Sequence, residues 1–195
     1  MGHDVISVEP FHDSLMRIHK ASSLENTQSR ITLVQNAVSN RRREQRQLTY
    51  ELENIGAQSL LDLSDGTFKF KFEIPERERD KYTVETILMD DLLAHVPKNR
   101  EHRPYSKCLI KIDIEGMEMY AFQNARQLFT QLQVQLVFME WKMMRQQVAA
   151  YPLIIQMINF LYSFELRPFA GETQLEKDSW REWPHDILWK RNNLI

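Results

Sequence analysis

The stretch Leu109-Ile110-Lys111-Ile112-Asp113-Ile114-Glu115-Gly116-Met117-Glu118 decides the fold that this sequence predicts. Its isoleucines alternate with charged residues, and side chains of a strand point alternately to its two faces, so the pattern predicts a strand with one apolar face. Gly116 permits a tight turn, and beyond it the apolar spacing becomes helical. We therefore predict a strand, a short acidic turn and a helix over residues 119–132.

The charged residues of this stretch have two interpretations. Half-exposed strands of antiparallel sheets carry solvated charges at the same spacing. The apolar entry through Cys108 and the helical run that follows favour a parallel strand–helix unit instead. Ligands of open α/β sheets bind at the carboxyl ends of the strands. We therefore expect Asp113, Glu115 and Glu118 to form a functional acidic cluster at that edge.

Length and composition predict a single globular domain that spans residues 1–195, because the chain is 43% hydrophobic and 27% charged. The net charge of −2 gives no overall positive field that would attract nucleic acid or an anionic membrane. The basic run at residues 40–46 has no interleaved aromatic residues to stack bases. We expect no nucleic-acid partner.

The sequence also predicts a soluble chain, cytoplasmic by default. Its most apolar window, residues 153–161, contains polar residues and is far shorter than the roughly 20 residues of a membrane span. The N-terminus has neither the basic nor the apolar region of a signal peptide. Cys108 is the sole cysteine, which excludes an intramolecular disulfide and suggests a small core residue in a reducing compartment.

Buried strands alternate with helices along the rest of the chain. Strands are predicted at residues 5–9, 31–34, 82–87, 134–140, 164–168 and 186–190, and helices at residues 11–22 and from Pro152 onward. This alternation favours a doubly wound α/β sheet. A polar strand at residues 47–52 and alternating phenylalanines at residues 68–72 predict an antiparallel pair, inserted between about residues 44 and 72.

Several segments, taken in order, form a pattern more specific than any single motif. They are Val5-Ile6-Ser7-Val8-Glu9-Pro10, residues 31–39, Gly56-Ala57-Gln58-Ser59, residues 86–93, Lys111-Ile112-Asp113-Ile114-Glu115-Gly116-Met117-Glu118, the strand that ends in Glu140, and Asp186-Ile187-Leu188-Trp189. This ordered set resembles the FkbM-type family of S-adenosylmethionine-dependent methyltransferases over nearly the whole chain. The segment from Lys111 to Glu118 looks like the signature of that family.

The resemblance implies a class I methyltransferase fold, which is a Rossmann-like sheet of seven strands with helices on both faces and an antiparallel last strand. In such folds an acidic residue after the second strand binds the ribose hydroxyls of the cofactor, and this role falls on Glu9. One carboxylate suits two hydroxyls, although a helix-capping or solvated carboxylate would look the same in sequence. Asn36 and Ala37 are expected beside the adenine.

The carboxyl end of the fourth strand in this fold lies beside the transferable methyl group, which places Asp113 and Glu115 there. Methyl transfer is an in-line displacement that needs an aligned acceptor and, for a hydroxyl, removal of a proton. Asp113 is our candidate for the base or the orienting group, and Lys111 on the same face is expected to keep it ionised. The histidines are scattered without metal-ligand spacing, so we expect no zinc site.

The family pattern begins before residue 5, with a central strand and an Asp-x-Gly-x-x-x-Gly loop around the methionine end of the cofactor. Without that strand, the strands at residues 5–9 and at Leu109 would expose unpaired edges or pair with a partner chain. We expect a truncated form of an O-methyltransferase for a small-molecule, sugar or lipid acceptor. Residues 1–195 alone are expected to bind S-adenosylmethionine too weakly to detect.

Two alternatives to this reading stay open. The first is a non-catalytic remnant or interaction module of the same fold, with its exposed edges covered by another protein. The second is a metal-dependent hydrolase that uses Asp113, Glu115 and Glu118, although Glu9 and the ordered match have no place in it. The sequence does not name the acceptor, because one fold supports many specificities through its loops.

Overall fold

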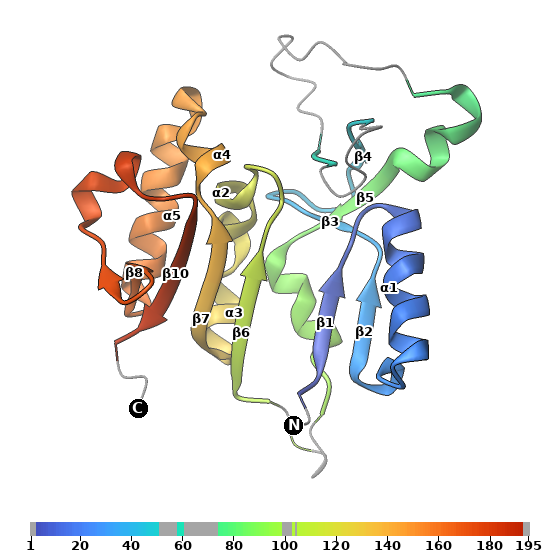
Figure 1. The fold of residues 1–195 in the computed structure, drawn as a ribbon, viewed down its shortest axis with the longest axis horizontal. Coiled ribbons are helices and arrows are strands. Elements are labelled where there is room, and N and C mark those ends of the chain that lie inside the picture. Colours follow the sequence, from blue (N-terminus) through green and yellow to red (C-terminus); the bar gives the residue numbers. More distant parts are fainter. Residues whose placement is uncertain (1–2, 51–57, 61–73, 99–102, 104, 193–195) are drawn as a thin grey trace. The chain divides into compact units, whose positions relative to one another are not determined.

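A computed structural model describes residues 3–50, 58–60, 74–98, 103 and 105–192 (Figure 1). The chain forms two compact units, Met1–Pro97 and Lys98–Ile195, and each is described by itself below. Both contain strands and helices, so the α/β class is confirmed. The single domain over residues 1–195 stays a prediction.

The first unit opens on a strand–helix–strand segment. Strand β1 (Val5–Val8) pairs in parallel with β2 (Ile31–Val34), and Val5 lies opposite Ile31. Between them lie helix α1 (His12–Leu24) and the short 3₁₀ helix η1 (Gln28–Arg30). Because Pro10 cannot donate a hydrogen bond to a neighbouring strand, β1 ends before it. The two predicted strands and the helix between them are confirmed.

A second sheet of this unit has β5 (Thr83–Ile87) at its centre. Strand β3 (Ala37–Val38) pairs with β5 in parallel, and β4 (Gln45–Gln47) pairs with it in antiparallel. The helices η2 (Glu76–Tyr82) and η3 (Met89–His95) flank β5.

The inserted antiparallel pair differs from the prediction. The polar strand begins two residues earlier than expected, and its partner is β5. Beyond it Leu48 forms an isolated antiparallel bridge with Leu60. The predicted strand at residues 68–72 lies outside the described residues. The strand bounds were wrong because polar residues carry no apolar alternation that would mark where pairing begins.

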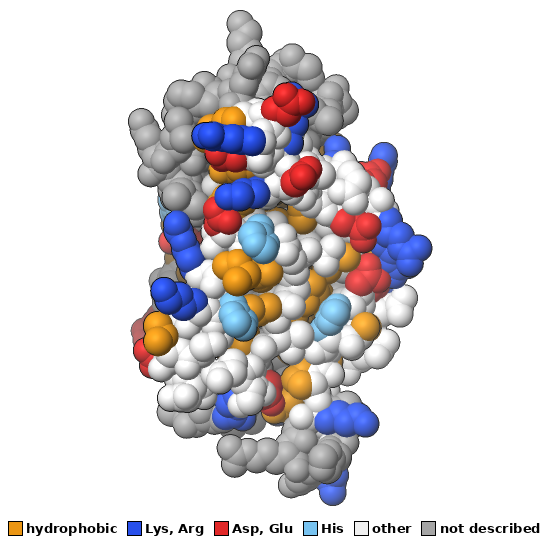
Figure 2. Space-filling model, turned by 90° about the vertical axis from the view of Figure 1, so that its right-hand side faces the viewer, with side chains coloured by type: hydrophobic (Ala, Val, Ile, Leu, Met, Phe, Trp, Pro, Cys, Tyr) orange, Lys and Arg blue, Asp and Glu red, His pale blue; other side chains and the backbone are white. Residues whose placement is uncertain are grey.

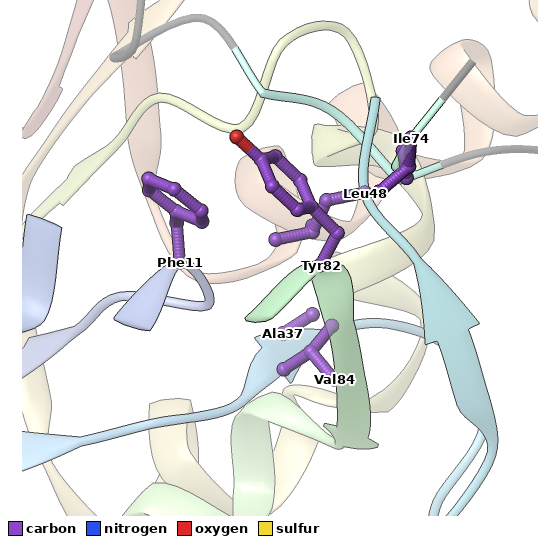
Figure 3. Close-up of a cluster of buried hydrophobic side chains, with 6 residues drawn as sticks. All are labelled: Phe11, Ala37, Leu48, Ile74, Tyr82 and Val84. Carbon is purple, nitrogen blue, oxygen red and sulfur yellow. The ribbon is translucent and has the colours of Figure 1, made fainter. Parts of the chain in front are cut away.

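A cluster of buried hydrophobic side chains forms a core of the first unit (Figure 3). Leu48 is fully buried in it, and the rings of Phe11 and Tyr82 lie 4.8 Å apart between centroids. The other members are Ala37, Ile74 and Val84. These residues come from segments far apart in the sequence. The cluster therefore packs Leu48 and Ile74, which lie between β4 and β5, against side chains of the strands.

Helix α1 contributes little to that core. Ser22 is its one buried residue, while Met16 and Leu24 are exposed. Figure 2 shows hydrophobic side chains gathered in the middle of one face of the molecule, with histidines among them and acidic and basic groups around them.

The second unit contains a five-stranded sheet in the order β6-β7-β10-β8-β9. The strands are β6 (Lys107–Ile112), β7 (Gln133–Glu140), β8 (Leu166–Ala170), β9 (Thr173–Gln174) and β10 (Asp186–Arg191). Strand β6 is parallel to β7, and the last strand, β10, runs antiparallel to both of its neighbours, as expected. Among the described strands, β6 and β1 each pair on one side only.

The helix predicted over residues 119–132 is wrong as a single element. The segment contains α2 (Glu118–Ala121), the 3₁₀ helix η4 (Phe122–Asn124) and α3 (Arg126–Gln131). Ala125, with φ of −120° and ψ of 2°, interrupts the helical path. The apolar residues keep one buried face across the break, and for this reason the helical spacing did not reveal it.

The remaining helices follow β7. They are α4 (Lys142–Arg145), η5 (Val148–Ala150), α5 (Tyr151–Ser163) and η6 (Lys177–Glu182). Pro152 lies in the first turn of α5, where a missing backbone N–H costs nothing. No helix among the described residues is long and apolar enough to cross a membrane.

Helices α2, α3 and α5 lie on one face of this sheet (Figure 1). The side chains toward that face are buried, Val137 and Ile187 completely. The opposite face leaves Leu109 68% and Phe138 39% exposed. Within the described part of this unit, helices thus cover one face, and the predicted cover on both faces stays a prediction.

Leu48→Ala is expected to lower the free energy of unfolding by about 2–5 kcal/mol, because it removes a fully buried side chain and leaves a cavity. Leu24→Ala is the matched control, since Leu24 is 73% exposed and its loss should cost less than about 0.5 kcal/mol. Urea unfolding of both variants measures the difference. Equal losses would show that the cluster around Leu48 is not a core.

Candidate functional site

The turn after β6 is the most constrained part of the candidate site. Glu115 and Gly116 both have positive φ angles, 56° and 88°, which lie in the left-handed region. The Gln147 side-chain amide donates a hydrogen bond of 2.8 Å to the Gly116 carbonyl. A Cβ on Gly116 would lie 2.5 Å from Gln147 Nε2, so glycine is needed here for conformation and for space.

Lys111 and Asp113 form an ion pair at the exposed edge of this turn. The distance from Lys111 Nζ to Asp113 Oδ2 is 2.9 Å. The pairing expected from their alternation along one strand face is therefore present. Both side chains are about half exposed or more, at 64% and 48%, so a ligand in solution can reach them. The catalytic roles of the two residues stay predictions.

Two further carboxylates, those of Glu115 and Glu140, lie near Asp113. Burial raises the pKa of Glu115, and the charges of Glu140 and Asp113 raise it further. Glu140, the last residue of β7, has its Oε1 3.2 Å from Nε2 of His185. Sequence reasoning did not place Glu140 or His185 in the site. The signal for Glu140 was its position, because it ends the strand beside β6 as an acid.

Glu118 does not join this exposed cluster, which corrects the expectation for it. Its side chain is completely buried, and Oε1 accepts a hydrogen bond of 3.0 Å from the Ile114 backbone N–H. Burial raises its pKa from 4.5 to about 7, against the opposing effect of the backbone donors. Its carboxylate thus points into the turn and supports it from inside.

The acidic edge is not a ready metal site. Among the residues that the structure describes, no three His, Cys, Asp or Glu side chains gather as metal ligands do. Of the three acids in the hydrolase alternative, Glu118 is engaged with backbone amides.

Glu9 lies in the first unit, directly after β1. Its Oε1 accepts a hydrogen bond of 2.8 Å from the Phe11 backbone N–H, at the start of α1. Burial raises the pKa of this half-buried carboxyl, and the bond from Phe11 opposes that effect. This bond matches the helix-capping interpretation in part, because it goes to the backbone N–H of Phe11, the N-cap residue of α1. Binding of ribose by Glu9 stays a prediction.

The two residues predicted beside the adenine differ in character. Asn36 is half-buried, and its Nδ2 donates a hydrogen bond of 3.0 Å to the Glu85 carbonyl. Ala37 is buried in the core cluster and lies opposite Thr86 in the sheet. Any contact of Ala37 with a ligand would therefore depend on its backbone. These residues and Glu9 belong to the first unit, whereas Asp113 belongs to the second.

The comparison with protein families explains this combination of strands and acids. The family model for the methyltransferase FkbM domain matches residues 1–168, which is most of the chain and part of both units. The chain belongs to the FkbM methyltransferase family.

One solved structure supports the fold of this FkbM chain. It is the crystal structure of the methyltransferase FkbM from Methylobacillus flagellatus KT, with a TM-score of 0.51 and 14% sequence identity. The match covers 96% of this chain and 36% of that one, so the FkbM chain described here spans about a third of its relative. The search of curated proteins gave no match.

Gly116→Ala is expected to destabilise the protein by about 1 kcal/mol more than Gly171→Ala, because the Gln147 side chain must move and lose its hydrogen bond to the Gly116 carbonyl. Both glycines have positive φ angles, but a Cβ at Gly171 meets nothing within 4 Å, whereas one at Gly116 collides with Gln147. The two variants therefore share the cost of a positive φ angle and differ in the contact with Gln147. Urea unfolding measures the free energy of unfolding of each variant. An equal loss of that free energy in both variants would refute the close contact at Gly116.

The burial of Glu118 predicts a pH dependence of stability. A carboxyl whose pKa rises from 4.5 to about 7 on folding stabilises the folded state fully below pH 4.5 and loses that contribution as the pH rises to 7. The loss is about 3 kcal/mol. The free energy of unfolding of Glu118→Gln should therefore gain about that much relative to wild type between these pH values.

Urea unfolding from pH 4.5 to pH 8 checks this prediction. Glu172→Gln is the control, because Glu172 is exposed in the turn between β8 and β9. A constant difference between wild type and Glu118→Gln across this range would contradict the raised pKa.

Proposed function

We propose that this chain belongs to an S-adenosylmethionine-dependent methyltransferase that methylates a hydroxyl group of a small-molecule, sugar or lipid acceptor. Family membership supports methyl transfer, and methyltransferases usually use this cofactor. The observation that carries the proposal is the exposed Lys111–Asp113 pair at the carboxyl end of β6. We further propose that both units belong to one domain, since the family match spans them.

Asp113 acts as the base in this proposal. Bound S-adenosylmethionine would supply the methyl group and leave as its thioether. The Asp113 carboxylate would accept the proton of the acceptor hydroxyl as that oxygen is methylated. The Lys111 ammonium donates a hydrogen bond of 2.9 Å to Asp113 Oδ2 and orients this carboxylate.

Glu115 has a supporting role. Burial raises the pKa of Glu115, and the charges of Glu140 and Asp113 raise it further. It lies two residues after Asp113 on the same turn, and we propose it as a further catalytic residue that contacts the acceptor.

The cofactor-binding residues are Glu9, Asn36, Ala37 and Asp113. The residues present fit the adenosine end of the group, because Glu9 is an acid at the end of a parallel strand and the bond from Phe11 uses only Oε1. Oε2 can accept a ribose hydroxyl beside it. Asn36 and the Ala37 backbone follow the adjacent strand β2, and in this proposal they contact the base.

Asp113→Ala is expected to lower kcat for methyl transfer by about 100-fold or more, because it removes the proton acceptor. The dissociation constant for S-adenosylmethionine should change much less. Glu9→Ala should show the opposite pattern, with weaker cofactor binding and a smaller effect on kcat. Transfer of a labelled methyl group and isothermal titration measure the two quantities, in protein expressed from the complete reading frame that encodes residues 1–195.

Glu172→Ala is the matched control, since it removes an exposed carboxylate of the second unit away from the turn. It should leave kcat and binding unchanged. Full turnover by Asp113→Ala would remove Asp113 from the mechanism. Failure of the wild-type protein from the complete reading frame to bind S-adenosylmethionine would overturn the proposed function, whereas undetectable binding by residues 1–195 alone is expected.

A second candidate function is an interaction module of the same fold. The observation that favours it is the edge strand β6, which pairs on one side only among the described strands and exposes Leu109. Under this proposal a partner chain covers the edge. Analytical ultracentrifugation of wild type and of Leu109→Lys tests it, because a charge on the strand would abolish association.

A further inference from the structure

Glu118 is unusual among the charged residues of the protein. Among the residues that the structure describes, it is the one charged side chain that is completely buried. Its neighbours Met119 and Ala121 in α2 are buried as well. A carboxyl in such surroundings is costly unless its hydrogen bonds serve the fold, so its contacts show what it does there.

Those contacts lead to the backbone of the turn that carries Asp113 and Glu115. Oε1 accepts the Ile114 N–H at 3.0 Å, and the N–H groups of Gly116 and of Glu118 itself also favour its charged form. The carboxylate therefore faces the amides on either side of Glu115. Oε2 has no hydrogen-bond partner and is buried.

The turn needs this support because its backbone is strained. Glu115 is a non-glycine residue with a φ of 56°, a conformation that costs about 1–2 kcal/mol. Gly116 follows with a φ of 88°. Its carbonyl is held by Gln147, whereas the amide of Ile114 is held by Glu118. Two side chains from different segments thus fix the backbone just after Asp113.

We propose that Glu118 is a positioning residue for methyl transfer, whose carboxylate holds the turn after β6 and thereby sets where the side chains of Asp113 and Glu115 lie. This inference rests on the proposed function for its catalytic part. The hydrogen bond to Ile114 carries it.

The charge of Glu118 decides how strongly the turn is held. A charged acceptor forms a hydrogen bond roughly twice as strong as a neutral one. With a pKa of about 7, Glu118 changes its charge near neutral pH. The charged group that acts on it from the neighbouring strand is Glu140, which itself pairs with His185, while Asp113 and Glu115 lie on the turn. The turn is held more tightly at pH 8 than at pH 6, although the contribution of Glu118 to the free energy of unfolding is larger at the lower pH.

The titration of Glu118 gives a direct test of its hold on the turn. In wild-type protein, the amide signals of Ile114 and Gly116 in ¹⁵N NMR spectra should shift with a midpoint near pH 7, together with the carboxyl carbon of Glu118. Hydrogen exchange at the Ile114 amide, corrected for the intrinsic effect of pH, should slow above that midpoint. Both changes should vanish in Glu118→Gln and persist in Glu172→Gln. An Ile114 amide that does not titrate in wild type would overturn the inference.

The effect of Glu118 on methyl transfer is measured separately, by kcat and its pH profile. Glu118→Gln should lower kcat about tenfold or more with an unchanged KM for S-adenosylmethionine, and should remove the limb of the pH profile near 7. Wild-type kcat and an unaltered pH profile in Glu118→Gln would refute the inference and leave the proposed function standing. If wild type transfers no methyl group but Ile114 titrates with Glu118, the proposed function fails and the hold of Glu118 on the turn stands.

Discussion

The hydrogen bond from the Ile114 amide to the buried carboxylate of Glu118 is the contact on which the candidate site depends. It lies under a turn with two successive positive φ angles, a conformation that an unsupported loop would leave. The bond between Gln147 and the Gly116 carbonyl holds the same turn from another segment. Together they fix the backbone that carries Asp113 and Glu115 just after β6.

The electrostatics of this edge follow from burial and spacing. Burial raises the pKa of Glu115, and the charges of Glu140 and Asp113 raise it further. Lys111 lies 2.9 Å from Asp113, and His185 lies 3.2 Å from Glu140. Shifted proton affinities are more common at functional sites than on solvated strand faces.

The two units have hydrophobic cores of different composition. In the first, a small cluster around Leu48 and Tyr82 joins segments that are distant in sequence. In the second, three tryptophans, Trp141, Trp183 and Trp189, pack against one another beneath the sheet, and the Trp141 N–H donates to the Trp180 carbonyl. The second core carries β7 and β10, and through β7 it supports β6 and the acidic turn.

The sequence by itself determined most strands, the helices α1 and α5, the family, and the proximity of Lys111 to Asp113. The elements depend on apolar period, the family on an ordered set of motifs, and the ion pair on two residues only two positions apart, and local sequence records all three. Tertiary structure alone decided the break at Ala125, the pairing of β4 with β5, the approach of Gln147 to Gly116 and the inward turn of Glu118. Each of these depends on backbone conformation or on contacts between distant segments, and a side-chain pattern does not record them.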